Sequence, residues 1–153
     1  MSIEAAGGTT IACPIEQVFD YLSDARNEPR WLPGALAVEK TSEGPVGLDS
    51  TFVGQYRRAG RVELRLVEFE RPHRVTFRAH SKIVDFDDAV DLIETRGSTR
   101  LQARMSASPR GAMRFLAPVM ARTLRRQFAA NWDHLRRVME NAPDEPAGSA
   151  RTN

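Results

Sequence analysis

Between residues 35 and 107, apolar and polar residues alternate along most of the chain, which is the two-residue period of a β-strand with one buried face. Val62, Leu64 and Leu66, for example, are separated by Glu63 and Arg65. Turn-forming residues divide this region into six predicted strands, over residues 35–42, 49–58, 61–70, 73–82, 83–95 and 98–107. Strands with one apolar and one polar face favour an antiparallel sheet that is covered on one side only.

The N-terminal segment predicts one further strand and two short helices. Residues 3–12 form an extended opening, and Pro14 can occupy the first position of a short helix. Residues 24–34 contain two prolines and a tryptophan and are interpreted as a second short helix or a turn.

A long amphipathic helix is predicted at the C-terminal end. Ser108 and Pro109 are suitable residues to begin it, and Asn141 followed by Pro143 would end it. Pro118 should kink this helix or separate a short first piece from the main one. Its predicted inner face is a stripe with spacings of three or four, comprising Met113, Leu116, Met120, Leu124, Phe128, Asn131, Leu135 and Val138.

Together these elements predict an α+β fold with a cavity. A sheet of seven twisted strands curls, and a single helix cannot fill its concave face. The chain of 153 residues is long enough for one domain, which we place at residues 1–141. Residues 142–153 are polar and rich in small residues, so we expect a flexible tail there.

Several motifs resemble the START-like (Bet v 1-like, SRPBCC) superfamily, and within it the bacterial polyketide cyclase/dehydrase and lipid-transport-like branch. They include residues 11–22 and the sequence Trp-Leu-Pro-Gly at 31–34. Further matches are Gly47 before Phe52, the turn at residues 68–72, and Thr99 after Gly97. The resemblance covers residues 3–141. It implies a helix-grip fold, in which a curved seven-stranded antiparallel sheet wraps around a long C-terminal helix, with two short helices between the first two strands.

Composition narrows the range of partners. The 22 basic and 20 acidic residues give a net charge of +2, which is too balanced to favour nucleic-acid binding. No apolar run is long enough to cross a bilayer, and no secretory signal is visible at the N-terminus. We therefore expect a cytoplasmic protein.

No metal or cofactor is expected. His73, His80 and His134 are far apart in sequence, and no glycine-rich nucleotide motif is present. Cys13 precedes a predicted helix, where a thiolate would be favoured, but no basic neighbour is identifiable. A buried structural thiol is therefore the preferred interpretation of this single cysteine.

Asp88 is the most informative polar residue. Side chains two residues apart on a strand share one face, and this spacing places Asp88 in an otherwise apolar row, whose other members are Val84, Phe86, Val90 and Leu92. A carboxylate on the inner face of a sheet must find a partner or shift its pKa upward. A bulge at residues 87–88 that turns Asp88 outward is the structural alternative. Tyr56 shares the parity of Phe52, and Arg58 extends that row, so Tyr56, Asp88 and Arg58 are the catalytic candidates.

The predicted ligand-binding residues combine the inner faces of the sheet and of the last helix. We expect a pocket of at least about 300 Å³, which is the lower end for ligand sites. Asn131 is a second inward polar residue, and Trp31 is either a lid or a core residue. The full set is Trp31, Phe52, Tyr56, Leu64, Phe77, Phe86, Asp88, Met105, Met120, Leu124 and Asn131.

Three functions remain open at this point. The first is binding of a hydrophobic or aromatic molecule, lipid-like or polyketide-like, in the cavity. The second is an enzyme, a polyketide cyclase, aromatase or dehydratase, acting in the same cavity. The third is an interaction module, because several arginines lie roughly along one side of the last helix. A solvated helix face is the default interpretation of such a row, but these arginines could also contact an anionic membrane, an acidic partner or the acidic strand of a second copy in a homodimer. These arginines are Arg114, Arg122, Arg125, Arg126 and Arg136.

Overall fold

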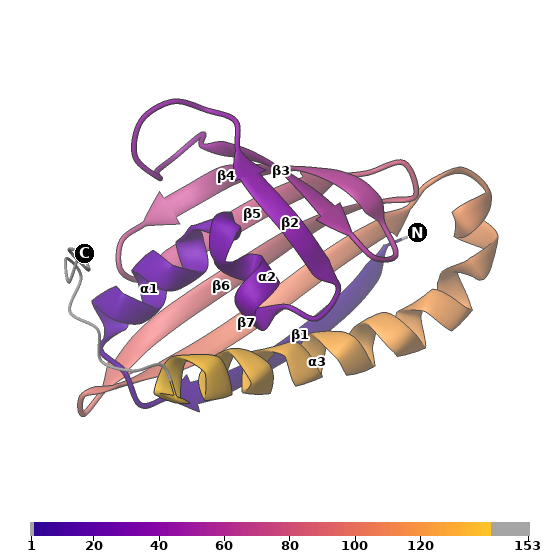
Figure 1. Ribbon diagram of the computed structural model, residues 1–153. Coiled ribbons are helices and arrows are strands. Elements are labelled where there is room, and N and C mark those ends of the chain that lie inside the picture. The colour runs from indigo at the N-terminus through magenta and orange to yellow at the C-terminus, as the bar shows by residue number, and fades with distance from the viewer. Residues whose placement is uncertain (1, 142–153) are drawn as a thin grey trace.

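Seven strands form one antiparallel sheet in the order β1-β7-β6-β5-β4-β3-β2 (Figure 1). The computed structural model describes residues 2–141, so the predicted tail at residues 142–153 lies outside the described residues. The strands are β1 (Ile3–Ile11), β2 (Ala35–Lys40), β3 (Thr51–Tyr56), β4 (Gly60–Glu70), β5 (Arg74–His80), β6 (Val84–Thr95) and β7 (Ser98–Pro109). The predicted α+β architecture and the helix-grip arrangement are confirmed.

Three short helical segments connect β1 to β2. They are α1 (Ile15–Ser23), the 3-10 helix η1 (Ala25–Asn27) and α2 (Glu28–Trp31). Pro14 immediately precedes α1, as predicted, and the Asp24 carboxylate accepts a hydrogen bond of 3.1 Å from the backbone N–H of Arg26 at the start of η1. The segment between Asp24 and Gly34 is therefore a 3-10 turn followed by one turn of α-helix.

The C-terminal helix begins later than predicted. Ser108 and Pro109 are the last residues of β7, and a 3-10 helix, η2 (Gly111–Leu116), follows them. The long helix α3 (Ala117–Asn141) starts with Pro118 in its first turn, where the missing N–H of proline costs nothing. Pro118 thus separates a short first piece from the main helix, which was one of the two expected outcomes.

The inner face of α3 differs in part from the predicted stripe. Leu116 is 50% exposed because it belongs to η2, and Met120 and Leu124 are only partly buried. The buried residues of the helix follow spacings of three, four or eleven and are Ala117, Phe128, Trp132, Leu135 and Met139. Trp132 was absent from the predicted stripe and is one of the largest fully buried side chains.

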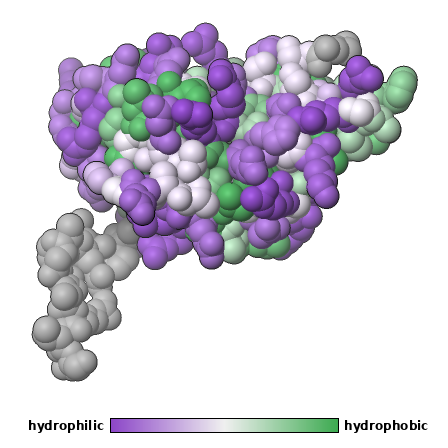
Figure 2. All heavy atoms as spheres, turned by 90° about the horizontal axis from the view of Figure 1, so that it is seen from above, coloured by the Kyte–Doolittle hydropathy of each residue, from purple (hydrophilic) through white to green (hydrophobic). Residues whose placement is uncertain are grey.

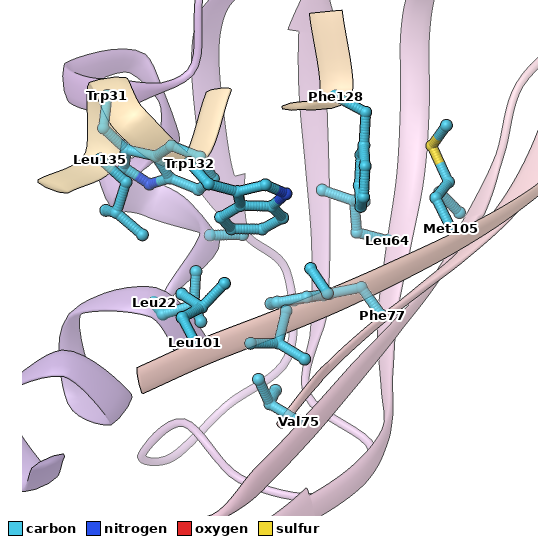
Figure 3. Packing of buried hydrophobic residues seen from close by; sticks show 14 of the residues in the cluster. Leu22, Trp31, Leu64, Val75, Phe77, Leu101, Met105, Phe128, Trp132 and Leu135 are labelled. Atoms are coloured by element: carbon cyan, nitrogen blue, oxygen red, sulfur yellow. The ribbon is translucent and has the colours of Figure 1, made fainter. Parts of the chain in front are cut away.

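A glycine on β1 allows α3 to lie close to the sheet. A Cβ atom at Gly7 would lie 2.9 Å from Cδ1 of Trp132 and 3.4 Å from the Cα of Ala129. The indole therefore occupies the space that a side chain on β1 would take. Figure 3 shows Trp132 and Leu135 above the sheet residues Leu64, Phe77 and Leu101, which complete this part of the core.

Candidate functional site

A pocket lies between α1, α2, α3 and the inner face of strands β3 to β6. The structure places seven of the predicted residues on its wall: Trp31, Tyr56, Leu64, Phe77, Phe86, Asp88 and Asn131. Glu28, Phe128 and Trp132 also line it and were not predicted as ligand-binding residues. Residues from widely separated parts of the sequence thus meet at one site.

Four residues of the predicted set are not on the wall of this pocket. Phe52 and Met105 are buried in the core, where the Phe52 ring packs edge-on against Phe77 at 6.1 Å between centroids. Met120 and Leu124 lie on α3 nearer its N-terminus than the three helix residues that line the pocket, Phe128, Asn131 and Trp132. The pocket therefore faces only the middle of α3.

The cavity is also smaller than expected. Its volume is about 60 Å³, against the expected minimum of about 300 Å³. Aromatic side chains fill the difference: the rings of Trp31 and Trp132 are 5.5 Å apart, and Phe128 packs edge-on against Trp132 at 5.4 Å (Figure 3). This space holds only a few water molecules.

Glu28 and Tyr56 form the first polar pair of the pocket. Glu28 is the first residue of α2, and its Oε2 accepts a hydrogen bond from the Tyr56 hydroxyl. Burial raises the pKa of Glu28 to about 7, although the hydrogen bond from Tyr56 acts in the opposite direction. Burial, followed by the charge of Glu28 and this hydrogen bond, raises the pKa of Tyr56 far above its ordinary value. The phenol is therefore a permanent donor.

The position of Tyr56 depends on a neighbouring glycine. Gly54 is buried on the same strand, and a Cβ atom there would lie 2.4 Å from Cε2 of the Tyr56 ring. The ring therefore lies over Gly54 instead of pointing straight away from the strand, which brings its hydroxyl to Glu28.

Asp88 is the second carboxyl of the pocket. The β6–β7 register continues from Val84 to Thr95 without interruption, so there is no bulge to turn Asp88 outward. It stands opposite Phe77 on β5 and Met105 on β7. Although the residue as a whole is half-buried, its Oδ1 atom is fully buried and has no hydrogen-bond partner among residues 2–141. Burial, and then the charge of Glu28, raises the pKa of Asp88 to about 7.

The expected group of Tyr56, Asp88 and Arg58 does not form. Strand β3 ends at Tyr56, and Arg58 is exposed in the turn that follows, so its parity does not bring it inward. The third polar group beside Tyr56 and Asp88 is instead Glu28, which accepts the hydrogen bond of the Tyr56 hydroxyl. The pocket wall, within the part of the chain that the structure describes, carries two carboxyls and no lysine, arginine or histidine.

Helix α2 is attached to its surroundings by polar contacts outside the pocket. Nδ1 of His134 on α3 donates a hydrogen bond to the carbonyl oxygen of Trp31. The Asn27 side chain donates a hydrogen bond of 2.9 Å to the carbonyl oxygen of Tyr21. Trp31 is 4% exposed, so it is a core residue in this conformation.

Cys13 is buried, with its Sγ 3.8 Å from the carbonyl oxygen of Met139.

The arginines predicted for the last helix lie on η2 and α3, and none of them lines the pocket. Arg114, Arg122, Arg125 and Arg126 are exposed, whereas Arg136 is half-buried. Arg125 donates a hydrogen bond of 2.9 Å to the carbonyl oxygen of Glu4. No helix within residues 2–141 has the length and apolar character needed to cross a membrane.

Solved structures with the same fold come from several organisms. A START superfamily protein from Mycobacterium smegmatis aligns with a TM-score of 0.69 and 13% identity, over 90% of this chain and 94% of that one. The Zhui aromatase/cyclase from Streptomyces sp. R1128 aligns with a TM-score of 0.70 and 17% identity, over 88% and 92%. A truncated norcoclaurine synthase from Thalictrum flavum aligns with a TM-score of 0.70 and 11% identity, over 93% and 96%.

These identities are low, so the structural likeness supports the fold alone. No curated protein matches the sequence significantly. A family model does: the one described as polyketide cyclase/dehydrase and lipid transport matches residues 3–140, which is nearly the whole described chain. The protein therefore belongs to the polyketide cyclase/dehydrase and lipid transport family.

Proposed function

We propose that the protein binds a small hydrophobic or aromatic molecule, lipid-like or polyketide-like, in the pocket, with a hydrogen-bond donor of that molecule on Asp88. One observation carries this proposal: a fully buried carboxyl oxygen of Asp88 lacks a partner in an otherwise mainly apolar site. A buried polar atom without a partner costs about 1–3 kcal/mol, which a donor on the ligand would recover. The family description, which includes lipid transport, supports a hydrophobic ligand.

The polar groups of the wall also indicate the charge of the ligand. Glu28 and Asp88 repel a carboxylate, and no basic side chain on the wall offsets that repulsion. The rings of Trp31, Trp132 and Phe128 attract a cation through their π faces. We therefore favour an amine or an alcohol over a fatty acid.

Binding must rearrange the pocket, because a cavity of about 60 Å³ is smaller than any drug-sized ligand. The side chains that fill it are Trp31 on α2 and Phe128 and Trp132 on α3. Since α2 has only four residues, its displacement is the simplest way to open the site. Tryptophan fluorescence should therefore report binding.

Three probes of matched size test the proposal: phenethylamine, phenethyl alcohol and 3-phenylpropanoic acid, each titrated against tryptophan fluorescence at pH 8. We expect the amine and the alcohol to bind and the acid to bind at least tenfold more weakly. Asp88→Asn should weaken amine binding by about 1–3 kcal/mol, or roughly 5- to 150-fold. Asp87→Asn is the matched control on the polar face and should bind as the wild type does.

Native mass spectrometry of the purified protein provides an independent test, because a co-purified hydrophobic molecule would appear as an added mass. The absence of a co-purified mass together with no response to any of the three probes would refute the binding proposal. Equal binding by wild type and Asp88→Asn would refute the role of Asp88 alone.

Acid–base catalysis in the same pocket is the second candidate function. The observation that favours it is the convergence of three groups, because Glu28 and Asp88 have pKa values of about 7 and Tyr56 is held as a donor. A carboxyl that titrates near neutral pH can both take and return a proton. Such a set suits a cyclase, aromatase or dehydratase, in which Asp88 would take a proton from the carbon beside a carbonyl. When Glu28 is protonated it can donate to the Tyr56 oxygen, which leaves the single hydroxyl proton of Tyr56 to stabilise the carbonyl oxygen.

The binding and the turnover of a substrate by Asp88→Asn distinguish catalysis from simple binding. A poly-β-ketone thioester, incubated with the protein and followed by mass spectrometry, should lose water during cyclisation and dehydration. A general base predicts that Asp88→Asn still binds the thioester but loses nearly all turnover. If the wild type leaves the thioester unchanged, the catalytic proposal fails and the binding proposal stands.

A further inference from the structure

An exposed apolar cluster lies at the end of the molecule that η2 occupies. Phe115 is 84% exposed, Val119 71% and Leu116 50%. These three side chains fall within five residues, and they account for half of the large hydrophobic residues exposed among residues 2–141. Figure 2 shows apolar side chains gathered at this end, which is opposite to α1 in Figure 1. Single exposed apolar residues are common on soluble proteins, but neighbouring ones that form a patch often mark an interaction site.

Positive charge surrounds this cluster. No acidic residue occurs between Arg110 and Trp132. Arg122 and Arg126 lie three and seven residues after Val119, which places them on the same side of α3 as Val119. A strip of basic side chains therefore runs along α3 from the apolar cluster. Arg114 and these two arginines are exposed, and none forms a salt bridge with another described residue.

We propose that this surface, the η2 patch, docks on an anionic lipid membrane. The η2 patch comprises Phe115, Leu116 and Val119 together with Arg114, Arg122 and Arg126. The three apolar side chains enter the headgroup region, and the arginines contact lipid phosphates beside them. An interfacial helix binds by this combination of apolar burial and electrostatic attraction.

A second copy of the chain fits the patch less well. The obvious acidic complement is β6, but three of its carboxylates are already paired with arginines of the same chain, which leaves Glu94 as its one exposed carboxylate without a salt bridge among the described residues. The pairs are Asp85 with Arg110 at 3.1 Å, Asp87 with Arg78 at 3.0 Å and Asp91 with Arg74 at 3.0 Å. In addition, three side chains are few for a stable protein interface, which usually buries about 1,200–2,000 Å². A fluid anionic surface needs neither a matched shape nor unpaired carboxylates on a partner.

The η2 patch and the pocket can be tested separately, because none of the six patch residues lines the pocket. The assay is co-sedimentation with phosphatidylcholine vesicles, prepared with and without phosphatidylserine, at low and at high salt. We expect the wild-type protein to associate only when phosphatidylserine is present and to dissociate at high salt.

Two variants divide the contributions, and each has a matched control. Phe115→Ser with Val119→Ser removes the apolar part, and Arg122→Glu with Arg126→Glu reverses the charge. Leu48→Ser, at a residue 61% exposed elsewhere, and Arg57→Glu with Arg58→Glu, in the turn after β3, are the controls. Each basic residue contributes about a fivefold factor, so the loss of two should weaken binding at least about 25-fold in the charge variant, while the controls bind as the wild type does.

Three results would overturn the proposal. The first is no association with phosphatidylserine vesicles at low salt. The second is equal loss in the patch variants and in their controls, which would mean that only overall charge and hydrophobicity matter. The third is a dimer in sedimentation velocity that the patch variants abolish while vesicle binding is absent, which would identify a second copy as the occupant.

Discussion

Replacing Asp88 by asparagine should stabilise the protein at alkaline pH, and the reason is the raised pKa of this carboxyl. In the folded chain, burial and the charge of Glu28 raise the pKa of Asp88 from its ordinary 3.8 to about 7. Between these two values the folded state binds a proton that the unfolded state does not, so the stability falls as the pH rises. Above pH 7 both states are ionised and the loss is complete.

The size of the effect follows from the same two values. At about 1.4 kcal/mol per pH unit, ionising Asp88 in the folded protein costs at most about 4 kcal/mol. The residue is only half-buried as a whole, so water screens part of this cost, and we expect about 2–4 kcal/mol. Asparagine keeps the volume and carries no charge. At pH 8 the variant should therefore be more stable than the wild type by about this amount, and at pH 4 nearly equal to it.

Urea denaturation followed by circular dichroism, at pH 4, 6 and 8, measures the free energy of unfolding directly. The pKa of Glu28 is also raised, so its ionisation likewise lowers the free energy of unfolding as the pH rises. The variant should therefore still lose stability with rising pH, but less than the wild type does. Asp87→Asn is the control: it removes only a surface pair with Arg78, worth about 0–1 kcal/mol, and should keep the wild-type pH dependence. A variant that is less stable than the wild type at pH 8, or one with an unchanged pH dependence, would refute the reasoning.

Two further substitutions test the packing around the site. Gly54→Ala places a Cβ atom 2.4 Å from the Tyr56 ring, so the ring must leave Glu28 and the melting temperature should fall, at a cost of about 1–3 kcal/mol; an unchanged melting temperature in differential scanning fluorimetry would contradict this. Thr99→Val removes a hydrogen bond of 2.8 Å to the buried carbonyl of Cys13 and should also cost about 1–3 kcal/mol in urea denaturation. A loss below about 0.5 kcal/mol would show that the carbonyl finds another partner.

The strands were predictable because their signal is local. Alternation with a period of two depends only on which side chains face the core, and it requires no knowledge of the neighbouring strands. The inward direction of Asp88 followed from this parity, and the uninterrupted β6–β7 register confirms it. The same reasoning was wrong for Arg58, because β3 ends two residues earlier and parity has no meaning in a turn.

The start of α3 shows where a local signal is ambiguous. Ser-Pro is a favourable helix start, yet Ser108 and Pro109 pair with Asp85 and Val84 in the sheet. Pairing with a neighbouring strand is a long-range interaction that outweighs the local preference. The helix α3 then begins at Ala117, with Pro118 in its first turn, where proline is tolerated.

Glu28 could not have been placed from the sequence. It stands in an irregular segment of three short elements, where one turn of helix has no measurable period. Glu and Pro are both favourable in the first turn of a helix, whether the Glu side chain is exposed or points inward, so the pair does not reveal its direction. Only the packing of α2 against the sheet and α3 brings its side chain to the Tyr56 hydroxyl.

The sequence by itself determined the family, the sheet, the last helix and the inward position of Asp88, because each of these depends on residue patterns along one segment. Tertiary structure alone decided which carboxyl joins Asp88 and how much space remains between sheet and helix. The volume depends on how the rings of Trp31, Phe128 and Trp132 pack against one another, and Gly7 allows the Trp132 indole to lie against β1. The contacts of Trp132 with Trp31 and with Gly7 join residues more than a hundred positions apart, so no pattern within a single segment records them.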